Sequence, residues 1–182
     1  MIDFKQVFSV MRSIVINRIG DEVSAVIQSR TTGTKPKSVY ATVDIQGIFD
    51  SAGHVTNKYL DSDTDEIVYE TVKDVDVVLS VRNGKIDDPE SQMAPYTLCN
   101  DLHKAFAEVL VRDYLYDNLN AVVRSTGAIR GSSDRYSTGY GTVQEFIVTI
   151  RMVDTTREAN TPIESVDMGE PQISDGSISF QG

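Results

Sequence analysis

The sequence predicts a single α+β domain in which a mixed or antiparallel β-sheet packs against two helices. Apolar residues recur with helical spacing in two separate segments, and they alternate with polar residues in several others. These segments follow the order helix, strands, helix, strands. That order favours an antiparallel or mixed sheet over one built from regular β-α units.

The first half of the chain is expected to hold one helix and the first strands. The helix covers Asp3–Ile19, with its first residue as a favourable N-cap and Gly20 ending it in the left-handed conformation that glycine adopts easily. Alternating residues predict strands over Val23–Ser29 and Ser38–Phe49, with a polar loop between them. The acidic span Val55–Asp65 is expected to be a loop or a frayed hairpin.

The clearest strand of the chain is predicted over Glu66–Arg82, where apolar residues from Val75 to Val81 alternate with polar ones. A second helix is predicted over Tyr96–Tyr114, and its apolar stripe is expected to include Val109 and Leu110.

The last part of the domain is predicted to hold two strands, Ala121–Thr126 and Val143–Asp154. Between them, Gly127–Thr142 is rich in glycine and serine and is long enough for a functional loop. The domain is expected to span residues 1–160. Residues 161–182 are rich in proline, glycine and serine and are expected to form an extended C-terminal arm.

Composition and charge exclude several classes of protein. The 182 residues are 40% hydrophobic and 24% charged, as in a globular domain, and the formal net charge is -10. Between Asp44 and Glu90, twelve acids face four bases, a difference of -8. Such a charge disfavours nucleic acid as a general ligand, because binding requires basic residues at the phosphates. A solvated acidic face that maintains solubility is the simplest interpretation.

Neither a secretion signal nor a membrane span is expected. Charged residues interrupt the apolar N-terminal segment, and no stretch approaches the roughly 18 apolar residues of a membrane helix. The single cysteine, Cys99, excludes an internal disulfide and is expected to be a buried apolar side chain.

The search for catalytic chemistry gives no complete site. The acidic run from Asp61 through Asp63 to Asp65 resembles the start of a calcium loop, but it lacks the glycine and the final glutamate that such a loop needs. Asp74 and Asp76 share one strand face, a spacing compatible with a metal-dependent hydrolase, yet no third group completes it. We therefore expect no enzyme activity, no cofactor and no metal.

One basic segment stands out in this acidic chain. Arg124, Arg130 and Arg135 lie close in sequence to Tyr136 and Tyr140. An exposed surface loop would explain them. Alternatively, the segment contacts an acidic partner, such as the acidic face of another copy, and heterologous contacts of that kind close into rings.

The order of elements also resembles a known family. The strand residues 74–82, the following helix around Leu102–Leu110 and the strand residues 145–151 come in the order seen in phage neck or tail terminator proteins. The helical N-terminus and residues 161–166 complete the pattern, so the resemblance spans about residues 1–168.

The resemblance implies a structural role in the virion tail or neck, after synthesis in the cytoplasm of the bacterial host. Members form a homo-hexameric ring that caps the tail tube, stops its polymerisation and joins it to the head-completion or connector protein, with the sheath as a further possible partner. Genomic DNA passes through the ring without specific binding.

Residue roles follow from the resemblance as expectations. The acids Asp61, Asp63, Asp65, Asp74 and Asp76 are candidates for an acidic lumen. The candidate subunit or partner contacts are Arg124, Arg130, Arg135, Tyr136, Tyr140, Pro162 and Ile163.

Two other functions remain open from the sequence. One is another ring-forming component, such as a head-tail connector or a tail-tube protein. The other is a monomeric module that binds a small ligand in a concave apolar pocket.

Overall fold

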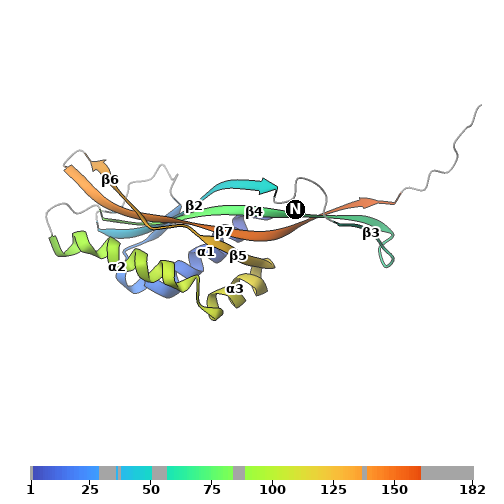
Figure 1. Cartoon of the computed structure of the whole chain (residues 1–182), viewed down its shortest axis with the longest axis horizontal. Coiled ribbons are helices and arrows are strands. Elements are labelled where there is room, and N and C mark those ends of the chain that lie inside the picture. The colour runs from blue at the N-terminus through green and yellow to red at the C-terminus, as the bar shows by residue number, and fades with distance from the viewer. Residues whose placement is uncertain are drawn as a thin grey trace, which may run out of the picture.

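A seven-stranded sheet runs the length of the molecule in the computed structural model (Figure 1), which describes residues 2–28, 36, 38–50, 57–83, 89–136 and 139–160. Side chains are described throughout these ranges except at residues 50, 89–91, 133–136, 139 and 140. The strand order is β1-β2-β4-β7-β5, with β3 also paired to β4 and β6 to β7. The strands are β1 Val26–Gln28, β2 Val39–Asp50, β3 Asn57–Asp61, β4 Glu66–Asn83, β5 Ala121–Thr126, β6 Arg130–Tyr136 and β7 Gly139–Ala159.

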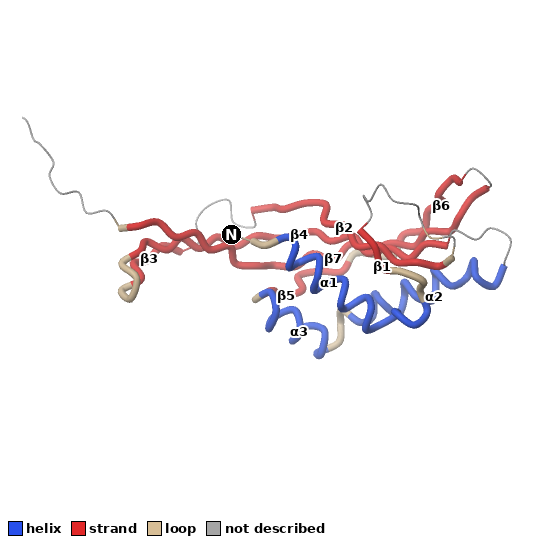
Figure 2. Tube along the Cα trace, turned by 180° about the vertical axis from the view of Figure 1, so that it is seen from behind, coloured by secondary structure: helices blue, strands red, loops and turns tan. Residues whose placement is uncertain are grey.

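The prediction of an α+β fold with a mixed sheet is confirmed. β1 runs parallel to β2, and the other strand pairs are antiparallel. In the described part of the chain, three α-helices, where two were expected, cover one face of the sheet (Figure 2). They are α1 Phe4–Ile19, α2 Pro89–Ala105 and α3 Val109–Leu119, and a short 3-10 turn, Gly20–Glu22, follows α1.

The core lies between the helices and the alternating apolar residues of the central strands. Val75, Val77, Leu79 and Val81 of β4 are fully buried, as the sequence predicts. Their neighbours on α1 include Met11, since its apolar face lies against the same core cluster. The opposite face of the sheet is not covered by any of the described helices; we call it the open face.

Helix α1 begins as predicted and ends differently. Asp3 caps it, because its Oδ1 accepts hydrogen bonds from the backbone N–H groups of Lys5 at 2.8 Å and Gln6 at 3.3 Å. Gly20 has φ -61°, so the predicted left-handed cap is wrong. The chain instead tightens into the 3-10 turn, which is a common way to satisfy the last helical carbonyls.

The predicted helix Tyr96–Tyr114 is wrong in extent, because the structure has two helices there. A tight turn separates α2 from α3: Ala107 N–H donates to the carbonyl of Lys104, and Glu108 N–H to that of Ala105. Phe106 anchors this turn, since its buried ring packs edge-on against a ring of β7. The turn resets the helical phase, so Val109 and Leu110, expected in the apolar stripe, are 69% and 80% exposed.

Two segments with loop predictions contain strands. For the acidic span Val55–Asp65, expected to be a loop or a frayed hairpin, the hairpin is confirmed, since β3 pairs with β4 from Asn57–Glu70 to Asp61–Glu66. Most of Gly127–Thr142 forms a hairpin of β6 with β7. Strand β7 also continues past its predicted end at Asp154 to Ala159.

The two ends of the sheet differ, because the β3 end extends beyond the helices whereas helix α2 reaches as far as the β6–β7 hairpin (Figure 1). At one end, β3 and the adjoining ends of β4 and β7 form a three-stranded extension of residues 57–70 and 153–159, which we call the projection. At the other end, the β6–β7 hairpin reaches past β4, since β4 pairs with β7 only as far as Arg82–Val143.

Candidate functional site

The open face carries an ion-pair cluster at its centre. Asp74 of β4 accepts a hydrogen bond from Nε of Arg151 at 2.9 Å and another from its Nη2 at 3.2 Å. Arg124 of β5 reaches across β7 and donates to Oδ2 of the same carboxylate, the oxygen that Nη2 of Arg151 also contacts. The Asp74 side chain is only 6% exposed, whereas the side chains of Arg151 and Arg124 are 37% and 52% exposed.

A β-bulge directs Arg124 toward this cluster. The register of β5 with β7 shifts between Val123 and Ser125, so Arg124 is the extra residue of the bulge. Bulges commonly re-aim a side chain in this way. Arg124, expected to contact a partner, therefore already forms an ion pair within its own chain.

The cluster fixes the charge state of Asp74. Hydrogen bonds from Arg151 lower the pKa of this carboxyl below its ordinary value, opposed by desolvation and helped by Arg124. Asp76 accepts a hydrogen bond from the hydroxyl of Thr149 at 2.7 Å. Asp74 and Asp76, two of the five acids expected on an acidic lumen, are thus held by side chains of neighbouring strands. Because Asp74 stays ionised through these hydrogen bonds, it is a poor proton acceptor.

The other three acids of the expected lumen lie at the tip of the projection. Asp61 ends β3, and Asp63 and Asp65 lie in the turn that leads to β4. Asp63 and Asp65 are exposed, and Asp65 turns the chain with φ 52°. Arg157 of β7 bridges Asp61 at 2.8 Å and Glu66 at 3.2 Å.

The projection stays acidic despite this bridge. Its tip, residues 61–66, has four acids, and Arg157 supplies one base, which leaves a formal charge of -3. The hydrogen bond from Arg157 is the largest influence on Asp61 and lowers its pKa, so the acid stays ionised at neutral pH.

The remaining expected contact residues lie at the opposite end or outside the description. Arg130 begins β6, and its Cα partner on β7 is Glu145. Arg135 pairs with Tyr140, and Tyr136 with Gly139, at the tip of the hairpin, where the side chains lie outside the described part. Pro162 and Ile163 are also outside the described residues.

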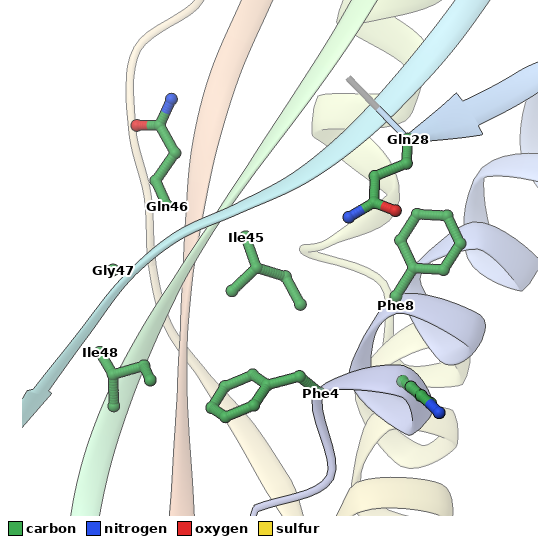
Figure 3. A pocket seen from close by; sticks show the side chains of 8 residues that line it. Phe4, Phe8, Gln28, Ile45, Gln46, Gly47 and Ile48 are labelled. Atoms are coloured by element: carbon green, nitrogen blue, oxygen red, sulfur yellow. The ribbon is translucent and has the colours of Figure 1, made fainter. Parts of the chain in front are cut away.

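An open groove lies between α1 and β2, a feature that the sequence did not indicate. It has a volume of about 530 Å³, and its apolar lining is Phe4 and Phe8 of α1 with Ile45 and Ile48 of β2. Figure 3 shows Phe4 extending from α1 toward β2, with Ile45 beside it and Gln46 pointing to the other side of the strand. We call it the β2 groove.

The β2 groove depends on a bulge in β2. The register with β4 shifts between Ile45 and Gly47. The shift lets both Ile45 and Ile48 line the groove, although an even strand would point residues three apart to opposite faces. A side chain at Gly47 would lie 2.7 Å from the ring of Phe49, so glycine leaves room for that ring.

No metal site is found among the described residues, where no group of three or more His, Cys, Asp or Glu side chains is placed to hold an ion. Cys99 is fully buried, as predicted, and burial raises the pKa of its thiol to about 12. It therefore stays protonated and unreactive at neutral pH. None of the helices in the described part is long and apolar enough to cross a membrane.

Comparison with known proteins finds matches among solved structures. No family model matches the chain, and no curated protein does. Among the solved structures, 33 chains match, and one of these is the sheath/tube terminator of an extracellular contractile injection system in its extended state. The chain is similar to that terminator.

The likeness to the terminator is distant. Sequence identity is 9% and the TM-score is 0.42, over 90% of this chain. The chain spans 61% of the length of the terminator.

Proposed function

We propose that this chain is a phage tail terminator, or neck, protein. Copies of it form a ring on the end of the tail tube, stop its polymerisation and join the tail to the head connector. The proposal rests on the sequence resemblance together with one geometric feature, the projection.

The projection has two outer edges that no described strand covers. One is the edge of β3, Asn57–Asp61, and the other is the end of β7, Thr156–Ala159, which lies beyond the last pairing of β5. Exposed edges of this kind pair readily with another chain. Pairing of the β3 edge of one copy with the β7 edge of the next is heterologous, and a heterologous contact closes into a ring when the rotation permits.

The acid at the tip suits a channel for DNA. We place Asp61, Asp63 and Asp65 on the lumen of the ring, where like charge keeps the phosphate backbone from binding. Asp74 and Asp76 are left out of this assignment, since both are bound within the chain.

The hairpin at the other end is the proposed surface for protein partners. Arg130, Arg135, Tyr136 and Tyr140 belong to it, and basic and aromatic residues are common at protein interfaces. The tube protein, the connector and the sheath are the partners for this surface. A homo-hexamer is the proposed ring, and the finished ring is part of the virion.

Native mass spectrometry of the chain, alone and mixed with its tube protein, tests the proposal. A six-copy species, alone or on the tube, together with arrest of tube growth, is the expected result. Long stacked polymers of the chain itself would instead identify a tube protein. A monomer under both conditions would exclude a ring-forming role and favour the ligand-binding module.

A matched pair of variants ties the ring to the projection. Leu60 on β3 is 54% exposed and Tyr116 on α3 is 59% exposed. Leu60→Glu is expected to abolish the six-copy species, whereas Tyr116→Glu leaves it intact. Equal loss in both variants, or in neither, would contradict the role of the projection.

A further inference from the structure

The β2 groove is open to strand addition. β1 pairs with β2 only from Val26–Ala41 to Gln28–Val43, and among the described residues no other strand lies along the outer edge of β2 at Gln46–Phe49. An added strand there would continue the line of β1. Its side chains on one face would enter the space between α1 and β2 (Figure 3).

The groove presents apolar surface to solvent. Phe4 is 38% exposed and Ile48 is 47% exposed, while Phe49 on the other face of β2 is 56% exposed. No described strand or helix covers these side chains, so the groove can accept an added segment.

The C-terminal segment of the chain has the sequence of a suitable strand. In residues 177–180, serine alternates with Ile178 and Phe180, which is the pattern of a strand with one apolar face. At about 3.3 Å per extended residue, the chain from Asn160 to Ser177 spans roughly 55 Å. The C-terminal segment is therefore long enough to extend well away from the end of its own β7, as docking on another copy requires.

Charge favours the same pairing. Residues 161–182 contain four acids and no base, whereas helix α1 contains three bases and no acid. One of these bases, Lys5, lines the groove. Attraction between the acidic segment and the basic helix would guide the approach.

We propose that residues 177–180 of one copy add as a strand to β2 of a second copy, with Ile178 and Phe180 in the β2 groove. This inference rests on the proposed self-assembly, because a second copy must lie close enough to donate the segment. The occupant is the C-terminal segment of another copy of this chain, and the contact links neighbouring copies.

Disulfide trapping between two differently tagged copies tests the proposal. One copy carries Ile48→Cys, and the other carries cysteine at one of positions 177–180 in turn. Cross-strand cysteines form a disulfide when their Cα atoms lie about 4.4–6.8 Å apart. The buried, protonated Cys99 does not compete. Tyr116→Cys, on exposed α3, replaces Ile48→Cys as the control.

Disulfide formation between the two copies is expected to alternate along the segment. Cysteine at position 178 or 180 forms the disulfide, and cysteine at position 177 or 179 does not. The Tyr116→Cys control gives none. A disulfide found only within one copy, when both cysteines are in the same chain, would overturn the assignment to a second copy. Six-copy rings without any disulfide would overturn this inference and leave the proposed function standing. Absence of the ring itself in native mass spectrometry would count against the proposed function.

Discussion

At the scale of single residues, the placement of Asp74 was predictable from the sequence, whereas the placement of Arg124 was not. The position of Asp74 on the polar face of a strand was predictable from the period of two. The contact with Arg124, one of its two partners, was not predictable, because Arg124 reaches Asp74 through a bulge, and bulges leave no periodic signal. A base expected at an interface therefore lies in an internal ion pair.

Removing the charge of Asp74 is expected to destabilise the domain. In Asp74→Asn, the two arginines lose a buried charged acceptor, and the free energy of unfolding should fall by about 1–3 kcal/mol. The loss is limited because both arginine side chains are partly exposed and can be hydrated. Urea denaturation measures it. Asp63→Asn, at an exposed turn, is the control and should change stability by less than about 0.5 kcal/mol.

The same carboxylate predicts a pH dependence. Its folded pKa is lowered, chiefly by the hydrogen bonds from Arg151, so the folded state favours the ionised form. This contribution is present above the unfolded pKa and is lost as pH falls through the folded pKa. Stability measured from about pH 6 down to about pH 2 should fall less steeply in Asp74→Asn than in the parent. Parallel curves would contradict the assignment.

At the scale of elements, the central strands and the first helix were predictable, and the ends of the sheet were not. β4 and α1 have apolar residues at a clear period, because one face of each lies on the core. β3 lies beyond the helices, and β6 pairs with β7 alone among the described strands, so the residues of both strands are mostly polar and show no clear period. The helix around Tyr96–Tyr114 looked continuous because apolar residues flank the turn at Phe106 on both sides.

The end of α3 depends on one left-handed residue. Asn120 has φ 47° and ψ 43°, and its N–H donates to the carbonyl of Tyr116 at 2.8 Å. Glycine adopts this conformation without strain, whereas a β-branched residue does not. Asn120→Val should lower the free energy of unfolding by about 1–2 kcal/mol, and Asn120→Gly should leave it nearly unchanged. Thermal denaturation of the two variants compares them, and equal melting temperatures would refute this cap.

At the scale of the whole molecule, the two ends of the long sheet differ in charge. The acidic turn of the projection lies at one end and the hairpin with Arg130 and Arg135 at the other. Charge counted along the sequence indicated one acidic face, but the described acids lie in different places. Asp74 and Asp76 are bound near the middle of the sheet, whereas Asp63 and Asp65 are exposed at the tip of the projection.

The protein is expected not to bind DNA even at low ionic strength, where electrostatic interactions are strongest. At low ionic strength, screening is weak, so a lumen with Asp61, Asp63 and Asp65 should repel the phosphate backbone most strongly. Fluorescence anisotropy with labelled duplex DNA measures this. Tight binding at low salt would exclude the acidic-lumen assignment, and Asp63→Lys with Asp65→Lys should create measurable, salt-sensitive binding.

The antiparallel ladder of β4 and β7 has a mechanical consequence. It runs without a register shift from Glu66–Ala159 to Arg82–Val143, along the long axis of the molecule. A pull that slides these two strands past each other along that axis loads the cross-strand hydrogen bonds together in shear, whereas a pull across the sheet opens them one after another. The protein should therefore be stiff along its length and weak across it, so its resistance to force depends on how the long axis is oriented to the pull.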